Sequence, residues 1–334
     1  MTTSSTTVPE ERFRDVLASA ARKGQATGLL GPTVALVAMC VVFSLVAPRF
    51  GTVGNLLLIA QQVVTIGTLA IGQTLIILVA GIDLANGVVM VFSTVVMASL
   101  ATSGLPIPLA VLCGFAVVLC FGAFEAAAVA AVGLTPFIVT LGLFTAARAG
   151  AQLYAGGAPI TNVPSGLLAL GDTWTLGGAM VPIGPLVMLG VLIVVWYALT
   201  QTAWGRHVYA VGNDRAAARL TGVRVRGVLT SVYLAAAVIY GVTALLFLGR
   251  ATVADPSAGL TYNLESITAV VIGGVSLFGG RGSVIGALVG ALIVGVLRNG
   301  LTIVGIDALY QDIAIGLLVI LAVGVDRLRR REGT

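Results

Sequence analysis

Charged residues are scarce in this sequence: they make up 9% of its 334 residues, whereas 58% are hydrophobic. Because so few polar side chains cannot cover a water-facing surface of this size, the composition excludes a soluble globular protein, and a mean hydropathy of +1.08 supports this conclusion. The sequence therefore predicts a polytopic membrane protein with an all-α fold.

Cysteine, histidine and lysine are also scarce, which limits the chemistry available to the chain. The three cysteines, Cys40, Cys113 and Cys120, lie in apolar runs without the paired spacing of a metal site, and His207 is the only histidine. A P-loop needs a lysine after its glycines to reach the phosphates of a nucleotide, and the only lysine, Lys23, lies in AARKGQATG. We therefore expect no metal or nucleotide cofactor in this chain, so any ATP energy comes from a partner.

Ten apolar runs, bounded by charges and by Gly/Pro turns, are candidates to cross a bilayer, for which about 20 residues are needed. Two of them are irregular: 54–80 is long enough to be a broken helix, and the glycine-rich run 265–280 is short enough to be half a span. Residues 154–184 form the longest outside connection, which we expect to be an ordered external cap. The ten runs are 29–47, 54–80, 84–103, 107–132, 135–153, 186–203, 228–249, 265–280, 283–303 and 306–325.

Basic residues at both ends of the membrane region predict that both termini are cytoplasmic. Arg22 and Lys23 precede the first run and DRLRRRE follows the last, and Lys and Arg near helix ends stay on the cytoplasmic side. The net charge of +5 therefore reflects membrane topology and not a nucleic-acid partner, because the arginines do not line one face with interleaved aromatics. The expected organisation is a cytoplasmic leader at 1–28, a transmembrane domain at 29–325 and a basic tail at 326–334.

A basic loop at 204–227 interrupts the transmembrane domain, and an inside start followed by six spans places it in the cytoplasm. Asn213 or Asp214 can cap a helix there, RAAARL propagates it, and Gly222 supplies a left-handed stop. Because a helix of about two turns is marginal alone in water, we expect it to dock on a partner. The alternative is that the arginines of the loop only enforce topology and contact anionic membrane lipid.

The segment AVGNDRAAARLTGVRV in this loop resembles the cytoplasmic coupling segment of bacterial ABC importer permeases of the ribose type. Further matches occur in the order of the family: GQTLIILVAGIDLANGVVM, LTPFIVTLG followed by Arg148, YAGGAPI, and a long segment that begins DPSAGLTYNLESITAVVIGGVSLFGGRGSVIG. The resemblance extends from about residue 55 to 331. The chain departs from the family pattern where Glu125-Ala126 replaces Asn-Gly and where Ala85-Asn86 replaces Ser-Val.

The resemblance implies an inner-membrane permease that moves a monosaccharide or related polyol delivered by a periplasmic sugar-binding protein. It further implies a second permease copy, in a homodimer, and a cytoplasmic ABC ATPase that binds ATP and Mg²⁺, with two cassettes in one chain. In the coupling helix, Arg215 and Arg219 share one face and set the orientation of the helix. The three alanines are small enough to let the helix approach a partner surface closely. The coupling helix carries over to Asn213, Asp214, Arg215, Ala216, Ala217, Ala218, Arg219, Leu220 and Gly222.

Polar residues inside the apolar runs are candidates for a gate or a pathway, because a sugar that must leave again needs weak polar contacts: Asp83, Asn86, Gln73, Gln61 and Glu125. We expect Asp83, between two spans, to cap the following helix; the alternatives are a role in gating or facing the ATPase, and direct contact with the substrate. Glu125 is expected either to lie near the cytoplasmic end of its span, solvated, or to line the path. For the glutamines, hydrogen bonds between helices are the alternative explanation and the one we favour.

Gly282, Gly286 and Gly290 recur every four residues, which predicts close packing of one helix against another within the subunit. Three charged residues lie on the outer side by this topology and pair either with a docking binding protein or with one another: Arg250, Asp255 and Glu265.

Two rival functions remain open from the residues alone. An ion-coupled secondary transporter needs a coupling site, and Glu125 and Asp83 are the only acids deep enough to provide one. An intramembrane enzyme needs facing acids, histidines or paired metal ligands, which this sequence does not offer. We therefore expect a transport subunit without catalytic activity of its own.

Overall fold

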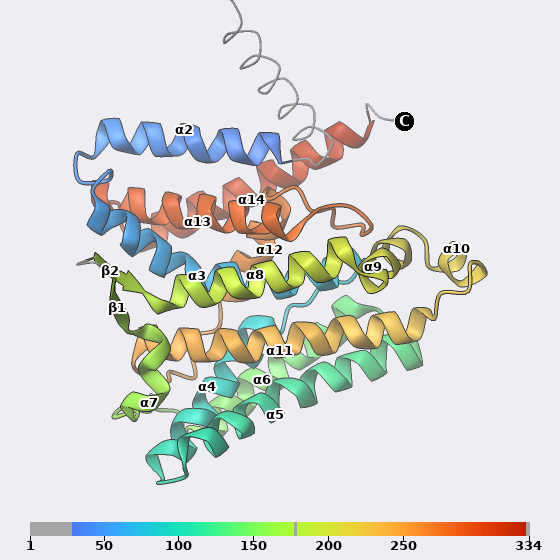
Figure 1. The fold of residues 1–334 in the computed structure, drawn as a ribbon, viewed down its shortest axis with the longest axis horizontal. Coiled ribbons are helices and arrows are strands. Elements are labelled where there is room, and N and C mark those ends of the chain that lie inside the picture. Colours follow the sequence, from blue (N-terminus) through green and yellow to red (C-terminus); the bar gives the residue numbers. More distant parts are fainter. Residues whose placement is uncertain (1–28, 177–178, 332–334) are drawn as a thin grey trace, which may run out of the picture.

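The computed structural model describes residues 29–176 and 179–331, which form a bundle of helices (Figure 1). Each of the ten predicted runs corresponds to one helix of this bundle. Five helices, α3, α8, α11, α13 and α5 with its continuation, are long and apolar enough to cross a membrane, which supports the polytopic prediction. The ten helices are α2 (Leu30–Val46), α3 (Val53–Leu78), α4 (Asn86–Thr102), α5 (Ile107–Ala126), α6 (Pro136–Tyr154), α8 (Ile183–Gln201), α11 (Val225–Ala251), α12 (Tyr262–Ile272), α13 (Val284–Val304) and α14 (Ala308–Arg331).

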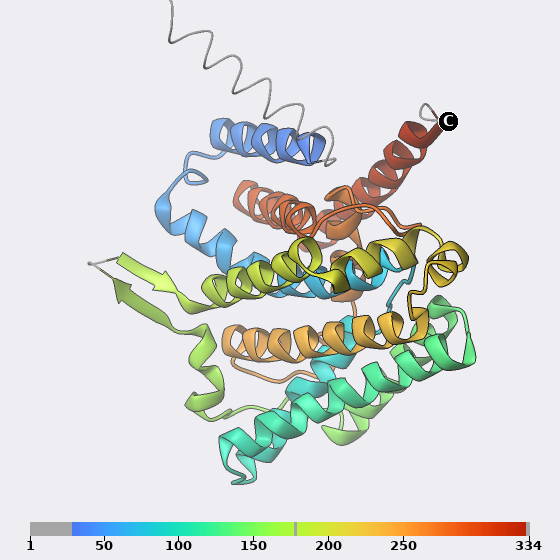
Figure 2. The same cartoon turned by 45° about the vertical axis from the view of Figure 1, so that its right-hand side comes forward.

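Shorter elements lie at the two ends of the bundle. The antiparallel pair β1 and β2, with α7, lies at one end, which we call the hairpin end, whereas α9 and α10 lie at the other, the loop end (Figures 1 and 2). The predicted external cap thus contains a small hairpin, an exception to the all-α prediction, because its Thr, Trp and Val residues favour strands. The shorter elements are η1 (Ala127–Val132), α7 (Ser165–Leu168), η2 (Ala169–Gly171), β1 (Thr173–Leu176), β2 (Ala179–Pro182), α9 (Ala203–Asn213) and α10 (Arg215–Leu220).

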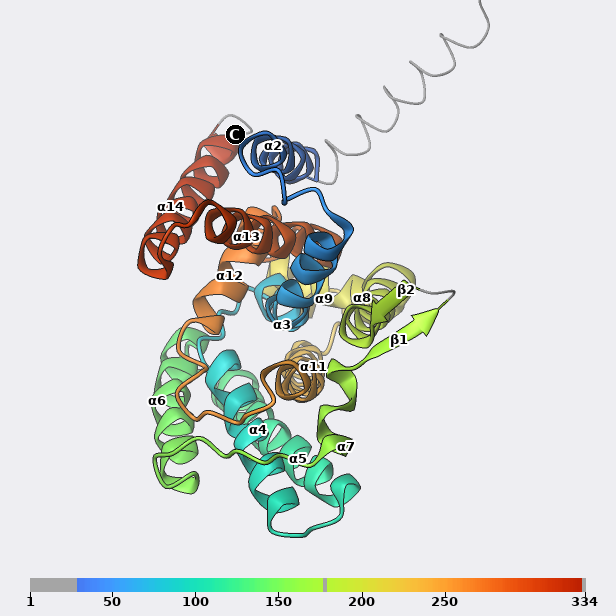
Figure 3. The ribbon, with the colours of Figure 1, turned by 90° about the vertical axis from the view of Figure 1, so that its left-hand side faces the viewer.

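Helix α3 is the centre of the bundle. Every residue from Val63 to Val79 is buried, as expected for a helix that is apolar on all sides. Seen along the helix axes, α3 is surrounded by α13, α12, α8 and α11 (Figure 3). It is one continuous helix of 26 residues, so the alternative that 54–80 is a broken helix is wrong.

The remaining helices cover two sides of this centre (Figure 3). Helices α2 and α14 lie beside α13, and α4, α5 and α6 lie beyond α11. Helix α14 continues to Arg331, past the predicted end of its span at 325, so the first part of the predicted basic tail is helical. The predicted leader at 1–28 and residues 332–334 lie outside the described residues.

Two helices begin inside the bundle instead of at its ends. After α3 the chain turns back through residues 79–85, and α4 starts at Asn86, which is fully buried. The start of α12 lies against it: a Cβ on Gly87 would stand 2.9 Å from the carbonyl oxygen of Gly259. With 11 residues, α12 is about 16 Å long, roughly half of a hydrocarbon core. This length agrees with half a span, although the helix begins before the predicted run 265–280 and ends at Ile272.

Glycines bring α12 and α13 into backbone contact. A Cβ on Gly290 would stand 1.8 Å from the carbonyl oxygen of Ala269, and one on Gly286 would stand 2.2 Å from that of Gly273. The predicted packing within the subunit is confirmed for these two glycines. Gly282 does not belong to this face, because it lies in the loop before α13 with a φ of +126°.

Replacing Gly290 by valine should destabilise the protein by about 3 kcal/mol, because the branched side chain has no room between α12 and α13. Gly190→Val is the matched control, since Gly190 lies in α8 with nothing within 4 Å of an added Cβ. The unfolding temperature of the detergent-purified protein measures the difference. Equal unfolding temperatures for the two variants would show that the α12–α13 contact is not tight.

Candidate functional site

Helix α10 at the loop end has the caps that its sequence predicts. Asp214 Oδ1 accepts hydrogen bonds from the N–H groups of Ala216, at 2.7 Å, and Ala217, at 3.1 Å. Gly222 has a φ of +85°, and its N–H donates to the Arg219 carbonyl oxygen at 3.0 Å, so the helix ends there. Of the two predicted caps, Asp214 is the one used, because Asn213 is the last residue of α9. The sequence did not predict α9.

Fewer side chains of α10 are exposed than the sequence predicted. Ala216 and Ala217 are exposed and Leu220 is 90% exposed, so these side chains are available to a partner. Ala218 is buried, because α10 packs on α9 and α11 through the side that carries it. Of the three alanines that were expected to seat the helix, Ala218 therefore faces its own subunit.

The two arginines of α10 do different things. The Arg215 guanidinium donates a hydrogen bond to the Val79 carbonyl oxygen at 3.1 Å and thus ties α10 to the end of α3. Arg219 is exposed and lines a surface pocket together with Arg224 and Arg226. The loop end therefore presents an apolar tip beside a basic pocket, a combination that suits an acidic partner surface.

A second candidate site, the buried polar cluster, lies where α4 and α12 begin. Asn86 Nδ2 donates to Gln73 Oε1 at 3.0 Å and to Ser266 Oγ at 2.8 Å. If the Gln73 amide is turned over, it bonds instead to the backbone N–H and carbonyl of Asp83, at 3.2 and 3.3 Å. In either orientation Gln73 holds the segment 83–86 against α3. Three of the five predicted pathway residues thus come together.

Asp83 bonds to Ala85, the residue just before α4, and the first turn of that helix has no side-chain cap; the prediction that Asp83 caps α4 is therefore not met. Its Oδ1 accepts a hydrogen bond from the N–H of Ala85 at 2.7 Å. Thr140 of α6 holds the same turn by donating to the Ile82 carbonyl oxygen at 3.1 Å. Sequence reasoning missed Thr140 and Ser266, although both lie in segments that resemble the family.

Glu125 is buried, which excludes the alternative that it is solvated at the end of a span. The reason is that η1 continues the helix for six residues beyond α5, so the carboxyl lies well inside the bundle. It lines a small internal pocket together with Asp83 and Tyr240. Gln61 lies apart from this group, in a pocket of about 360 Å³ at the hairpin end that Asp172 and Arg250 also line.

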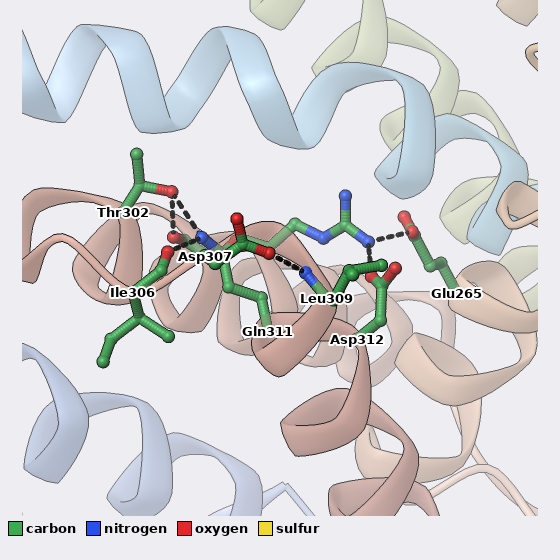
Figure 4. A network of polar contacts seen from close by, with 8 residues as sticks. Glu265, Thr302, Ile306, Asp307, Leu309, Gln311 and Asp312 are labelled. Atoms are coloured by element: carbon green, nitrogen blue, oxygen red, sulfur yellow. Dashed lines mark hydrogen bonds and ion pairs between the residues drawn. The ribbon is translucent and has the colours of Figure 1, made fainter.

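Glu265 does not face outward as one alternative required. It is buried in α12 and pairs with Arg298 of α13 at 2.6 Å, and Arg298 also pairs with Asp312 of α14 at 2.8 Å (Figure 4). Gln311 joins the same helices by donating to Thr302 Oγ1 at 3.0 Å (Figure 4). The Glu265 carboxylate is thus buried and paired within its own subunit, whereas Arg298 and Asp312 stay partly exposed. Arg298 was not singled out, although an arginine within an apolar run is a signal of such pairing.

The other two predicted outer charges have local partners. Arg250 donates to the Gln62 carbonyl oxygen at 3.4 Å, and Asp255 Oδ1 accepts from the N–H of Ser257 at 2.8 Å. Neither pairs with the other or with Glu265 among the ion pairs of the described residues.

Comparison with known proteins adds independent information. Residues 55–323 match the family described as branched-chain amino acid transport system / permease component. The chain is similar to the fructose import permease protein FrcC of Rhizobium meliloti, with 41% identity over 90% of this chain and 85% of the relative. It is similar to the ribose import permease proteins RbsC of Bacillus subtilis, 33% identical over 89% of this chain and 92% of the relative, and of Escherichia coli K12, 34% identical over 89% and 93%. No solved structure matches.

Removal of Arg298 should destabilise the protein more than removal of Asp312. Arg298→Ala leaves the Glu265 carboxylate buried and unpaired, which costs about 3 kcal/mol. Asp312→Ala removes a carboxylate that is 51% exposed and should cost less than about 1 kcal/mol. Unfolding temperatures of the purified variants test this order, and the double variant Arg298→Met with Glu265→Leu should recover most of the loss.

Substitutions of Asp83 separate the role of its hydrogen bond to Ala85 from a role of its charge. Asp83→Asn keeps an oxygen that accepts from Ala85, so stability should stay close to wild type, whereas Asp83→Ala should lose about 1 kcal/mol. If Asp83 acts only through this hydrogen bond, uptake into cells expressing the Asn variant stays normal. Normal stability combined with lost uptake in the Asn variant would instead assign its negative charge to the transport step.

Proposed function

The chain belongs to the branched-chain amino acid transport system / permease component family, and we propose that it moves a monosaccharide or related polyol across a bacterial inner membrane. It is the permease component of a binding-protein-dependent ABC importer, a transport subunit and not an enzyme. The proposed cargo is supported by the relatives, which are named as fructose and ribose import permeases, with identities of 33–41%.

One observation supports an external motor above the others: α10 is a six-residue helix that exposes Leu220 beside a basic pocket. A helix this short is marginal in water, and a leucine that is 90% exposed gains from being covered by a partner. The partner we propose is a cytoplasmic ABC ATPase with two cassettes in one chain, which binds ATP and Mg²⁺. The arginines of the basic pocket would face acidic residues of that ATPase.

The remaining partners follow from the topology proposed for the chain. About ten spans with both termini cytoplasmic place the loop end in the cytoplasm and the hairpin end in the periplasm. A periplasmic sugar-binding protein then docks at the hairpin end, near the pocket that Gln61, Asp172 and Arg250 line. A second copy of the permease completes the assembly as a homodimer, and lipid surrounds it.

The buried polar cluster is the proposed gate. Gln73, Asn86 and Ser266 offer amides and a hydroxyl, the groups that hold a sugar by weak hydrogen bonds, at the point where two helices begin inside the bundle. Discontinuous helices that meet within a membrane are a common place for transporter sites. Glu125 lies behind this cluster, in the pocket it shares with Asp83.

The shared pocket of Asp83 and Glu125 is also the one observation that favours a second candidate function, an ion-coupled secondary transporter. The two functions differ in their energy source. Uptake that persists under an uncoupler while ATP is held constant supports the importer, whereas uptake that collapses under the uncoupler supports ion coupling.

Ala217→Arg and Gly222→Val should abolish sugar uptake with little change in membrane abundance. Ala217 is exposed, so an arginine there leaves the fold intact and blocks the partner, and Gly222 has a φ of +85° that valine does not tolerate. Ala203→Arg, at an exposed position of the same end, is the control and should transport normally. Normal ATP-driven uptake by the Ala217 and Gly222 variants would contradict the coupling role of α10.

Purification of the tagged chain from its own host in mild detergent, with mass spectrometry of the proteins that accompany it, tests the partner. Recovery of a two-cassette ATPase by wild type, and its loss with Ala217→Arg, is the expected result. A chain that purifies alone, from vesicles that take up sugar without ATP, would contradict the proposed function.

A further inference from the structure

The residues around the start of α10, which we call the root of α10, pack directly against the C-terminal end of α3. Gly212, at the end of α9, lies so close to α3 that a Cβ there would stand 1.7 Å from the Leu78 carbonyl oxygen and 2.7 Å from the Gly280 nitrogen. The N–H of Gly280 donates to the same Leu78 oxygen at 2.9 Å. Three segments that are far apart in the sequence thus meet backbone to backbone.

The third segment is the loop between α12 and α13, and its glycines fit here for two reasons. Gly279 and Gly280 have φ angles of +83° and +69°, which favour glycine. A Cβ on Gly279 would also stand 2.7 Å from the Gly212 carbonyl oxygen, and one on Gly280 would stand 2.8 Å from Asn213 Cα. We call Gly212, Gly279 and Gly280 the glycine junction.

Two side chains brace the glycine junction. Arg215, the first residue of α10, donates to the Val79 carbonyl oxygen at 3.1 Å. Tyr209 of α9 donates through its hydroxyl to the Gly282 carbonyl oxygen at 2.9 Å. The root of α10 is therefore bonded both to the end of α3 and to the α12–α13 loop, whereas Gly222, at the other end of α10, has nothing within 4 Å of an added Cβ.

The part of α3 that the junction touches leads directly into the buried polar cluster. Ala80 follows with a φ of +59°, an uncommon conformation for a residue with a side chain, and the chain then turns to Asp83. Gln73 and Ser266 hold this turn and Asn86 by hydrogen bonds. A shift of the α10 root therefore cannot be absorbed at Leu78–Ala80 without moving the segment that ends at Asn86, because close-packed backbones transmit strain.

We propose that the glycine junction is the positioning element that transmits movement of the ATPase from α10 to the turn at 79–85, and so to the start of α4. The buried polar cluster is then the part of the permease that rearranges when ATP is hydrolysed. This inference rests on the proposed function, because it requires that α10 contacts a motor. It adds which internal contact couples the motor to the membrane region.

The test is a comparison of Gly212→Ala with Gly190→Ala, since Gly190 lies in α8 with nothing within 4 Å of an added Cβ. Each variant is purified with the ATPase that accompanies it and reconstituted in vesicles with the periplasmic binding protein from the same host. ATP hydrolysis and uptake of radiolabelled D-fructose and D-ribose are measured together. For Gly212→Ala, the sugar moved per ATP hydrolysed should fall about tenfold, although the ATPase is still recovered. The Gly190 variant should keep the wild-type ratio, and a wild-type ratio for Gly212→Ala would overturn the proposal.

Tyr209→Phe is the second variant, because it removes one hydrogen bond without adding bulk and should fold even if Gly212→Ala does not accumulate. It should lower the sugar moved per ATP by about threefold. A ratio equal to wild type for Tyr209→Phe, when Gly212→Ala cannot be purified, would overturn the proposal. If wild type itself recovers no ATPase, or takes up neither sugar with ATP, the proposed function fails and this inference fails with it. If wild type couples normally and the variants do as well, only the inference fails.

Discussion

The structure depends on one constraint: within a bilayer no water is available, so polar backbone groups must find partners inside the protein. Most of this chain meets the constraint with helices. The turn at 79–85 and the starts of α4 and α12 do not, and they are found where side chains replace the missing helical bonds. Asp83 accepts from the Ala85 N–H, and Thr140 donates to the Ile82 carbonyl oxygen. A polar cluster at this place therefore has a structural purpose before it has any role in transport.

The same constraint governs where charge is found. Arg298 pairs with Glu265 and Asp312, and these two ion pairs join α12, α13 and α14. At the loop end, Arg219, Arg224 and Arg226 are exposed and have no acidic partner in the ion pairs of the described residues. Paired charge thus joins helices of the bundle, whereas three unpaired arginines lie where a motor is proposed to bind.

Glycines form close backbone contacts both within the helix bundle and at the loop end. Gly286 and Gly290 let the backbones of α12 and α13 touch along one face of the helix. Gly212, Gly279 and Gly280 allow backbone contact at a single point, between the root of α10 and the end of α3. The first contact lies along the short helix α12 and the second lies in the loop that follows it. The start of α12 touches α4. A permease built in this way has a rigid centre, α3, with the polar turn at one end of it, and the proposed motor helix lies directly against that end.

The sequence by itself determined the helical runs, the membrane class and the caps of α10, because each depends on neighbouring residues: apolar length, the oxygen of Asp214 and the backbone freedom of Gly222. It also led to the family through ordered segments. Only the tertiary structure decided that Ala218 and Glu125 are buried, that Glu265 pairs with Arg298, and that Gly212 touches Leu78. These facts depend on which helices become neighbours, and periodicity within one segment cannot specify contacts between residues far apart in the chain.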